Sequence, residues 1–332
     1  MHSLVFDLGG TYIRSAVALD DGMLYDVTRA RIPNVFSGES ARSVYERILD
    51  MIYERVERCA QDRVPLERIV ISFPGPVRNR QLALAAPTIS GPCPPPDIAS
   101  MISERTKLPV HLVNDVSAAA WHIGERIDAD RFLVLTISSG IGSKLYDRTS
   151  YLRVLDDAPY AGEIGHVCVD SCPDAPSCDC GERGHLGAIA SGRGTERLAR
   201  ARAASDRETF SRSICAVRYG ATPEQLSNER HLVPAVCDRD PWACTVIRDA
   251  MRPLATALTT IAHACGLERI IVIGGFAGAL GNWYVEELKA LMHESSAPAF
   301  SVPRSLVQTW ETEQDVCLYG AAAFARTLPA YV

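Results

Sequence analysis

One pattern occurs twice in this chain and limits its fold more than any other feature: an apolar strand that runs directly into a glycine-rich turn. The first copy is Leu4-Val5-Phe6-Asp7-Leu8-Gly9-Gly10-Thr11, and the second extends from Phe132 to Ile137 and continues into Ser138-Ser139-Gly140-Ile141-Gly142. Short apolar runs bounded by turn residues predict buried strands. Two such units in 332 residues predict an α/β protein of two domains, with a ligand at the carboxyl ends of the strands, between the domains.

The stretches around these turns alternate between strand and helix patterns. An amphipathic helix is predicted from about Glu39 to Asp62. The other expected elements are strands at 13–19, 68–73, 110–113 and 270–273, a further strand that ends near Ala30 after the Asp20-Asp21-Gly22 turn, helices at 97–105, 117–125 and 319–328, and a loop at 87–96. We expect an N-terminal domain of residues 1–125, with the closing helix near 317–332 packed on it, and a C-terminal domain of residues 126–316.

Composition excludes several classes of protein. Hydrophobic residues make up 47% of the chain and charged residues 22%, which is typical of a globular protein. The net charge of -6 gives no basic surface for nucleic acid or acidic lipid, and no apolar run is long enough to cross a bilayer. An acidic residue, Asp7, interrupts the N-terminal apolar segment before the core of a signal peptide can form, so we expect a cytoplasmic protein.

The two turns have the residue types of a phosphate site. A carboxylate at a strand end can hold a hydrated Mg²⁺ ion, and glycines let the backbone approach an anion closely. Asp7, Gly9, Gly10 and Thr11 fit this role, and Ser139-Gly140-Ile141-Gly142 offers a second anion-binding loop. Each turn alone is equally consistent with a hairpin that uses glycine only to turn. Together they predict two clamps on one polyphosphate.

The chain resembles the ROK sugar kinases and repressors of the actin and hexokinase superfamily over nearly its whole length. Seven pieces carry the resemblance in order: Asp7-Leu8-Gly9-Gly10-Thr11, Pro74-Gly75-Pro76-Val77, Asn114-Asp115, Ser139-Gly140-Ile141-Gly142, Gly162-Glu163-Ile164-Gly165-His166, Cys178-Asp179-Cys180-Gly181 and Ile273-Gly274-Gly275. The resemblance implies an actin-like (ribonuclease H-like) two-domain kinase, with its active site in the interdomain cleft. It also implies transfer of phosphate from ATP, with Mg²⁺, to the 6-hydroxyl of a hexose. A homodimer is expected.

The same resemblance implies roles for individual residues. Asp115 corresponds to the catalytic base. The substrate-binding set is Gly75, Pro76, Thr88, Asn114, Asp115, Glu163 and His166, and the ATP and phosphate set is Asp7, Gly9, Gly10, Thr11, Ser139, Gly140, Gly142, Gly274 and Gly275. A carboxylate that accepts the proton of a sugar hydroxyl suits this chemistry, since the hydroxyl is a poor nucleophile at neutral pH. Asn114 and Asp115 also favour the N-cap of the helix that follows, and both roles are compatible.

A metal site is the second expectation from the resemblance. His166, Cys178 and Cys180 match three ligands of the structural zinc site of the family, and the fourth ligand position, usually Cys, is His185 here. Zinc accepts two Cys and two His ligands in tetrahedral geometry. Cys168 and Cys172 are spare thiols, and either could replace a ligand. If one ring nitrogen of His166 binds zinc, the other could bond the sugar.

Two departures from the family pattern bear on the substrate. Gly187 stands where a Glu is usual, and Thr88 stands where an Asn is usual. A site that lacks partners for particular hydroxyls no longer enforces them. We therefore expect a modified substrate, either an amino sugar such as kanosamine or a seven-carbon cyclitol of an antibiotic pathway. The alternatives are an ordinary glucokinase, with a neighbouring residue such as Glu182 filling the vacant place, and a non-catalytic sugar-binding regulator. We expect no DNA-binding extension, because the phosphate motif starts at Asp7.

Overall fold

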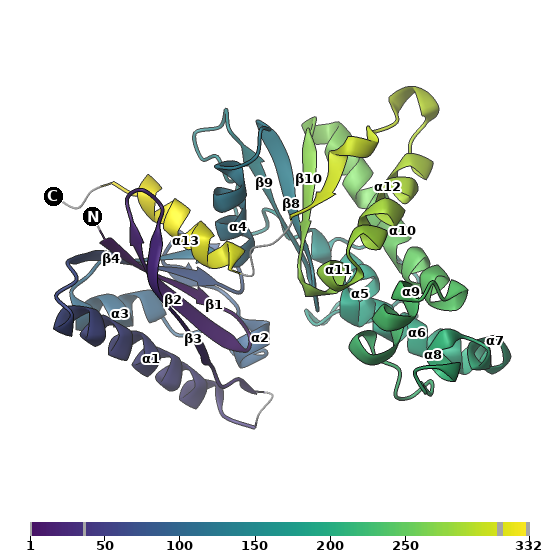
Figure 1. The fold of residues 1–332 in the computed structure, drawn as a ribbon, viewed down its shortest axis with the longest axis horizontal. Helices are drawn as coiled ribbons and strands as arrows, with labels where there is room; N and C mark the ends of the chain where they lie inside the picture. The colour runs from purple at the N-terminus through teal and green to yellow at the C-terminus, as the bar shows by residue number, and fades with distance from the viewer. Residues whose placement is uncertain (1, 36–37, 311–314, 330–332) are drawn as a thin grey trace. The chain divides into compact units, whose positions relative to one another are not determined.

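The computed structural model describes residues 2–35, 38–310 and 315–329 (Figure 1). It divides into two compact units. Unit 1 consists of Met1–Asp128, Tyr146–Ala161 and Thr312–Val332, and unit 2 consists of Ala129–Leu145 and Gly162–Glu311. The expected boundary at residues 125 and 126 lies close to the first crossing after Asp128. The structure differs from the expected division in assigning residues 146–161 to unit 1.

Unit 1 is built on a five-stranded sheet with the strand order β3-β2-β1-β4-β7. Its strands are β1 (His2–Leu8), β2 (Tyr12–Leu19), β3 (Leu24–Arg31), β4 (Leu66–Phe73) and β7 (Val110–Asn114). β1, β4 and β7 run parallel, whereas β2 is antiparallel to both of its neighbours. The parallel register pairs Asp7 with Ser72 and Phe73 with Asn114. Asp7 and Asn114 therefore lie at the same edge of the sheet, where the parallel strands end.

Helices cover the sheet of unit 1 because successive strand residues point to opposite faces. Helix α1 (Ala41–Gln61) buries Ile48 and Ile52 in the same core as Leu4 and Phe6, together with α3 (Ile98–Thr106). Helices α4 (Asp115–Gly124) and α13 (Val316–Thr327) pack on each other, and α13 also contacts β1 and β4 (Figure 1). A Cβ atom at Gly320 would lie 1.9 Å from the carbonyl oxygen of Ala118, so only glycine permits this close packing.

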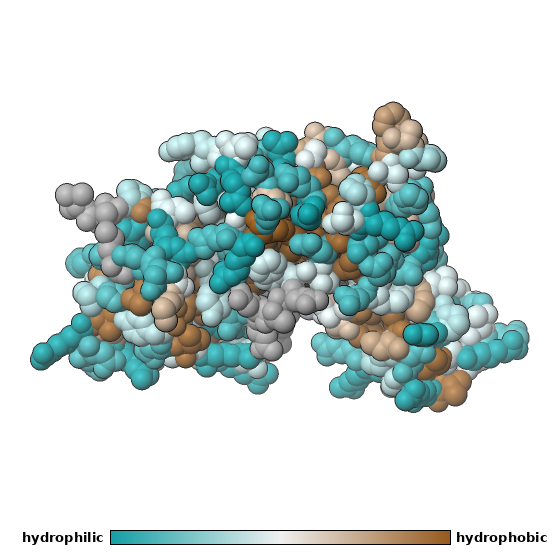
Figure 2. Space-filling model, turned by 45° about the horizontal axis from the view of Figure 1, so that its top comes forward, coloured by the Kyte–Doolittle hydropathy of each residue, from teal (hydrophilic) through white to brown (hydrophobic). Residues whose placement is uncertain are grey.

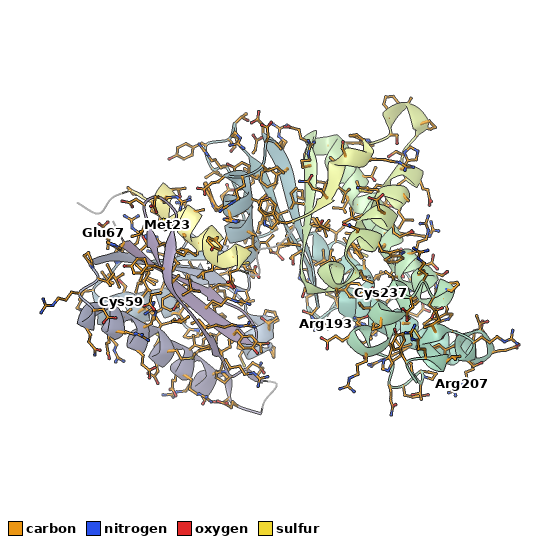
Figure 3. All side chains as sticks on the ribbon, viewed as in Figure 1. Met23, Cys59, Glu67, Arg193, Arg207 and Cys237 are labelled. Atoms are coloured by element: carbon orange, nitrogen blue, oxygen red, sulfur yellow. The ribbon has the colours of Figure 1, made fainter. Side chains whose placement is uncertain are left out.

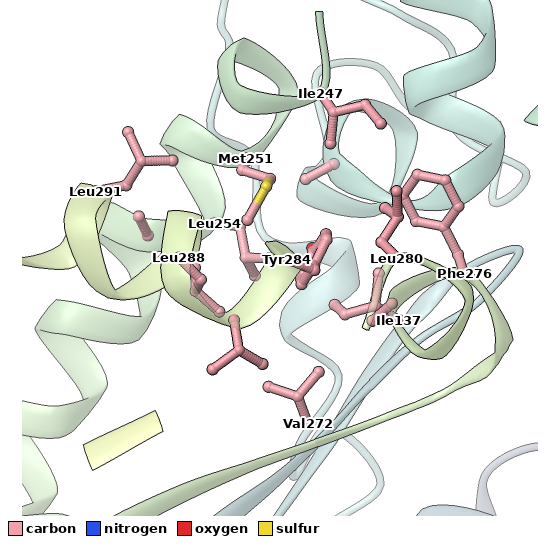
Figure 4. Close-up of a cluster of buried hydrophobic side chains, with 14 of the residues drawn as sticks. Ile137, Ile247, Met251, Leu254, Val272, Phe276, Leu280, Tyr284, Leu288 and Leu291 are labelled. Atoms are coloured by element: carbon pink, nitrogen blue, oxygen red, sulfur yellow. The ribbon is translucent and has the colours of Figure 1, made fainter. Parts of the chain in front are cut away.

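Unit 2 contains a four-stranded sheet with the order β11-β10-β8-β9. Its strands are β8 (Arg131–Ile137), β9 (Ile141–Asp147), β10 (Arg269–Ile273) and β11 (Val307–Thr309), and β10 runs parallel to β8 and β11. The main helices are α5 (Leu186–Ala190), α6 (Gly192–Ser205), α10 (Pro241–Cys265), α11 (Gly275–Leu280) and α12 (Asn282–Glu294). Figure 4 shows Leu254 of α10, Leu288 of α12 and Val272 of β10 among the hydrophobic side chains clustered in the core of this unit.

Several expected boundaries differ from the structure. The segment 87–96, expected as a loop, begins with the short helix α2 (Pro87–Ser90). The helix expected to start at Ser117 starts at Asp115, because Asn114 caps it. The remaining short elements are β5 (Val77–Arg78), β6 (Leu82–Ala83), α7 (Arg207–Ser211), α8 (Ile214–Val217), α9 (Val233–Cys237), the 3₁₀ turns η2 (Ile164–His166), η4 (Pro298–Phe300) and η5 (Arg304–Leu306), and the π-helical turn η3 (Asn228–Leu232).

The surface shown in Figure 2 is mostly hydrophilic, with hydrophobic residues in scattered patches. Single exposed apolar side chains are normal on a protein surface. Among the described residues, no helix combines the length and the apolar character needed to cross a membrane.

Candidate active site

The turn after β1 presents a buried carboxylate beside closely packed backbone. The Asp7 side chain accepts a hydrogen bond from Arg14 at 2.7 Å and one from the hydroxyl of Ser72 at 3.3 Å. Gly9 N–H donates to the Tyr12 carbonyl at 2.9 Å and so closes the turn. A Cβ atom at Gly10 would lie 3.0 Å from the side chain of Thr88. The turn therefore needs small residues at the positions where a phosphate would approach.

The charge on Asp7 is only partly offset within unit 1. Burial raises the pKa of the Asp7 carboxyl above its usual 3.8, and the attraction of Arg14 opposes that rise without cancelling it. Arg14 also pairs with Asp315 at 2.8 Å. The Asp7 oxygens are the hard donors that Mg²⁺ prefers, and Mg²⁺ usually keeps several of its waters. A single carboxylate already bonded to Arg14 fits a metal ion that is held through water.

Asn114 and Asp115 form the start of helix α4. The Asn114 side-chain oxygen accepts from the N–H groups of Val116 and Ser117 at 3.1 and 3.2 Å, so Asn114 is the N-cap. Its amide nitrogen donates to Asp115 Oδ1 and to the carbonyl of Gly75, both at 3.0 Å. Asp115 Oδ1 also accepts from Val116 N–H at 2.9 Å. The Asp115 carboxylate is therefore held in place at the N-terminus of α4.

Gly75 and Pro76 lie next to this cap. A Cβ atom at Gly75 would lie only 2.0 Å from the carbonyl oxygen of Ala85, so no other residue fits there. The Pro76 carbonyl accepts from Leu84 N–H at 2.9 Å, next to the β5–β6 pair. Thr88 is exposed in α2 and touches the Gly10 turn. The sequence identified these residues but gave no sign that Thr88 packs on the turn that contains Gly10.

In unit 2, the glycine-rich turn after β8 and the glycine pair at the start of α11 lie next to each other. In the turn between β8 and β9, Ser138 N–H donates to the Gly140 carbonyl at 3.0 Å, and a Cβ atom at Gly140 would have no neighbour within 4 Å. Gly274 has φ +102°, and a Cβ atom there would lie 2.5 Å from the carbonyl oxygen of Ile137, the last residue of β8. Gly274 and Gly275, at the start of α11, therefore lie beside the turn that contains Ser139, Gly140 and Gly142.

Arg193 contacts the predicted glycine-rich turn of unit 2, and sequence reasoning missed it. It lies in the first turn of α6 and is labelled in Figure 3. Its guanidinium donates to the Ser139 carbonyl at 2.9 Å and pairs with Asp179 at 2.6 Å. One side chain thus ties the glycine-rich turn to the Cys178–Cys180 segment. An arginine at the second position of a helix carries no motif that would have identified it.

Glu163 and Lys144 form an ion pair in unit 2, and Lys144 was also missed. The Lys144 Nζ lies 3.8 Å from Glu163 Oε1, and the Lys144 side chain is only 6% exposed, compared with 31% for Glu163. Glu163 immediately precedes η2, and its carbonyl accepts from His166 N–H at 3.0 Å. The sequence feature that could have drawn attention to Lys144 is the scarcity of lysine, since the chain has only three lysines.

Four side chains form a compact cluster of metal-ligand types: His166, Cys178, Cys180 and His185. Their ligand atoms all lie within 4.8 Å of one another. Cys178 Sγ is 3.7 Å from His166 Nδ1, and Cys180 Sγ is 3.3 Å from His185 Nδ1. A tetrahedral zinc ion with Zn–S at about 2.3 Å and Zn–N at about 2.0–2.1 Å would separate such atoms by about 3.6 Å. The cluster fits zinc in donor type and in spacing.

The spare thiols have other contacts. Cys168 Sγ donates to the Asp170 carbonyl at 3.5 Å, and Cys172 N–H donates to the Asp170 carboxylate at 3.0 Å. Neither thiol belongs to the cluster. Gly187, in α5, is close to the same region, since a Cβ atom there would lie 3.1 Å from the carbonyl oxygen of Gly165. A side chain at 187 would therefore press on η2, which carries His166.

The predicted site residues divide between the units. Unit 1 holds the residues from Asp7 to Asp115, with the β1 turn and the Asn114 cap at one sheet edge. Unit 2 holds Ser139 to Gly275, including Glu163 and the metal-ligand cluster. Each unit by itself brings together the residues predicted within it.

Comparison with known proteins defines the class. The model described as the ROK family matches residues 4–328, and the chain therefore belongs to the ROK family. A similar relative is "C(7)-cyclitol 7-kinase" of Streptomyces hygroscopicus subsp. jinggangensis (strain 5008), 35% identical over 97% of this chain and 93% of the relative. Another is "2-epi-5-epi-valiolone 7-kinase" of Actinoplanes sp. (strain ATCC 31044 / CBS 674.73 / SE50/110), 31% identical over 84% of this chain and 79% of the relative.

The fold agrees with that class. The solved structure of a ROK family glucokinase from Streptomyces griseus, in complex with glucose and AMPPNP, matches with a TM-score of 0.73 and 23% identity. The match covers 98% of this chain and 100% of the glucokinase, so the α/β, actin-like fold is shared. Family membership and the kinase relatives together make this chain a carbohydrate kinase.

Proposed function

We propose that this protein transfers the γ-phosphate of ATP to the primary hydroxyl of a seven-carbon cyclitol. The observation that carries the proposal is the similarity to "C(7)-cyclitol 7-kinase", which extends over 97% of this chain. It agrees with the departures at Gly187 and Thr88, which remove a carboxylate and replace an amide by a hydroxyl in the family's substrate-binding pattern. An amino sugar is the second candidate, and glucose is the third.

Asp115 is the proposed catalytic base. As the primary hydroxyl oxygen forms a bond to the γ-phosphorus, the bond from that phosphorus to the β–γ bridging oxygen breaks and ADP leaves. The proton of the hydroxyl passes to the Asp115 carboxylate. Positioned bases of this kind contribute about 10²–10⁴-fold to a rate. The hydrogen bonds from Asn114 and Val116 to Asp115 Oδ1 support this role, because they fix the carboxylate before the substrate arrives.

The phosphates of ATP are assigned to the glycine-rich segments. In this proposal Gly10 and Thr11 of unit 1, with Ser139, Gly140 and Gly142 and with Gly274 and Gly275 of unit 2, offer backbone N–H groups to the phosphate oxygens. Gly9 belongs to the same site but closes the β1 turn, because its N–H donates to the Tyr12 carbonyl. Asp7 would hold Mg²⁺ through water, and that ion neutralises charge on the transferred phosphate when it is bound. Most of the rate enhancement in phosphoryl transfer comes from such positioning and charge neutralisation.

The ring hydroxyls are assigned to Glu163 and His166, with Gly75, Pro76 and Thr88 lining the site. Asn114, also expected to bind the sugar, already uses both amide hydrogens and both oxygen lone pairs within the protein, so its proposed role is to position Asp115. His166 Nδ1 faces Cys178, so its other ring nitrogen is the one assigned to the substrate. The proposal includes one zinc ion held by His166, Cys178, Cys180 and His185, which would fix the ring of His166.

The decisive experiment is an ADP-release assay of the purified protein with ATP, Mg²⁺ and a panel of substrates. The panel contains C7 cyclitols with a primary hydroxyl, kanosamine, N-acetylmannosamine and glucose. We expect the highest kcat/KM with a cyclitol. Asp115→Asn should lower kcat by about 10²–10⁴-fold without unfolding the protein, because an amide of equal size does not accept the proton. Glucose as the best substrate would refute the cyclitol proposal, and an active Asp115→Asn variant would refute the base.

A further inference from the structure

We infer that Lys144 offsets the negative charge of Glu163 and thereby selects an uncharged polyol over a substrate with an ammonium group at the ring position that Glu163 contacts. The inference rests on the proposed function, because it assumes that Glu163 binds the substrate. It separates the two leading substrate classes, since a cyclitol can be neutral whereas a free amino sugar carries a positive charge.

The backbone fixes the two side chains against each other. Ser143, next to Lys144 on β9, donates from both its N–H and its hydroxyl to the Gly162 carbonyl at 3.0 Å. Gly162 has φ +81°, and a Cβ atom there would lie 1.9 Å from the Ser143 carbonyl oxygen and 3.0 Å from Lys144 Cδ. The stem of Lys144 therefore runs along Gly162. This path brings its ammonium to the next residue, Glu163.

A second close contact holds the chain segment that follows Glu163. A Cβ atom at Gly165 would lie 2.4 Å from the carbonyl oxygen of Ile141, at the start of β9. β9 thus touches the chain both before and after Glu163. The Lys144–Glu163 pair is a consequence of this packing and not of two long side chains meeting by chance on a surface.

The burial of Lys144 indicates a specific role. A buried ammonium costs free energy unless a charged or polar partner compensates it. The side chain of Lys144 is 6% exposed, and its ammonium pairs with Glu163 at 3.8 Å. Glu163 itself is 31% exposed, so a ligand can still reach its carboxylate. The ammonium of Lys144 is therefore buried, whereas the carboxylate of Glu163 is accessible to a ligand.

This arrangement determines which ligand groups the subsite accepts. An isolated carboxylate attracts an ammonium group and also accepts hydrogen bonds from hydroxyls. With Lys144 behind it, the Glu163 carboxylate still accepts hydrogen bonds from hydroxyls, but the Lys144–Glu163 pair carries no net charge. An ammonium on the substrate would gain little attraction and would be repelled by Lys144. A neutral hydroxyl loses none of its bonding.

The test compares matched substrates on three variants. Lys144→Met keeps an apolar stem of similar length and removes the charge, Lys144→Arg keeps the charge, and Lys144→Gln removes the charge but stays polar. The substrates are a neutral C7 cyclitol with a primary hydroxyl and its analogue with an amine in place of one secondary hydroxyl, with glucose and glucosamine as a second pair. The assay runs at about pH 6.5, where an alkyl amine is protonated.

We expect the wild type to prefer the neutral member of each pair in kcat/KM. Lys144→Met and Lys144→Gln should each lower that preference about five- to tenfold, a modest factor because Glu163 is partly in contact with water. Lys144→Arg should keep it. The change should lie mainly in KM of the amine substrate, which a loss of packing alone would not produce, because lost packing would affect both members equally.

Unfolding of Lys144→Met leaves Lys144→Gln as the informative variant, and circular dichroism with a melting curve identifies folded protein. A folded, charge-free variant with an unchanged preference overturns the inference. So does a wild type that uses both members of a pair equally well. If the wild type phosphorylates no cyclitol or sugar in the panel, the proposed function itself fails, and that outcome is distinct from an unchanged preference.

Discussion

Replacing Asn114 tests how the base is held, because this side chain makes four hydrogen bonds in unit 1. Its oxygen caps α4 through Val116 and Ser117, and its amide nitrogen donates to Gly75 and Asp115. Losing an N-cap typically costs about 1 kcal/mol, and a buried hydrogen bond about 1 kcal/mol more. The bond to Asp115 adds less, because that carboxylate is partly exposed. Asn114→Ala should therefore lower the free energy of unfolding by about 2–3 kcal/mol.

A serine at the same position separates capping from positioning. Asn114→Ser keeps a side-chain oxygen for the cap but has no amide to reach Gly75 and Asp115. Its stability loss should be about 1 kcal/mol, whereas its kcat should fall as far as that of Asn114→Ala, by about 10–100-fold, because Asp115 is no longer aligned. Urea unfolding and ADP-release kinetics measure the two effects. Wild-type kcat in a folded Asn114→Ser variant would refute the positioning argument.

Three further predictions follow from the same geometry. Metal analysis should find about one zinc per chain, and Cys178→Ser combined with Cys180→Ser should remove it and lower the melting temperature, whereas Cys168→Ser should keep it. Asp7→Asn should abolish activity but raise the free energy of unfolding near pH 7, because burial raises the pKa of Asp7 and so makes its charged form unfavourable in the folded protein. Urea titrations should show that the stability difference between variant and wild type shrinks as the pH falls through this raised pKa toward 3.8. Gly187→Glu should raise kcat/KM for glucose relative to a cyclitol by at most about tenfold. Gly187→Ala is its control for pressure on the Gly165 carbonyl, and equal ratios in the two variants would exclude a carboxylate effect.

Local sequence patterns were sufficient to predict those strands and helices whose formation depends mainly on neighbouring residues. The strand that ends at Asp7, the strand that ends at Ile137 and the helix after Asn114 were all predicted close to their observed bounds. Apolar runs and turn residues act within a few positions, so they can be read in sequence. The helix at Pro87–Ser90 was missed because a Pro-, Gly- and Ser-rich segment predicts loop, and helix formation there depends on burying Ile89.

The sequence by itself determined the α/β class, the two glycine-rich turns, the Asn114-Asp115 pair and the four metal-ligand types, because each depends on residue identity and short spacing. The tertiary structure decided which side chains contact one another. Arg14 meets Asp7, Thr88 touches Gly10, and Lys144 reaches Glu163 because of sheet register and close backbone packing. Such contacts join segments separated by up to tens of residues, and no local pattern encodes them. The charge of the Glu163 subsite, and with it the choice between neutral and cationic substrates, depends on that packing.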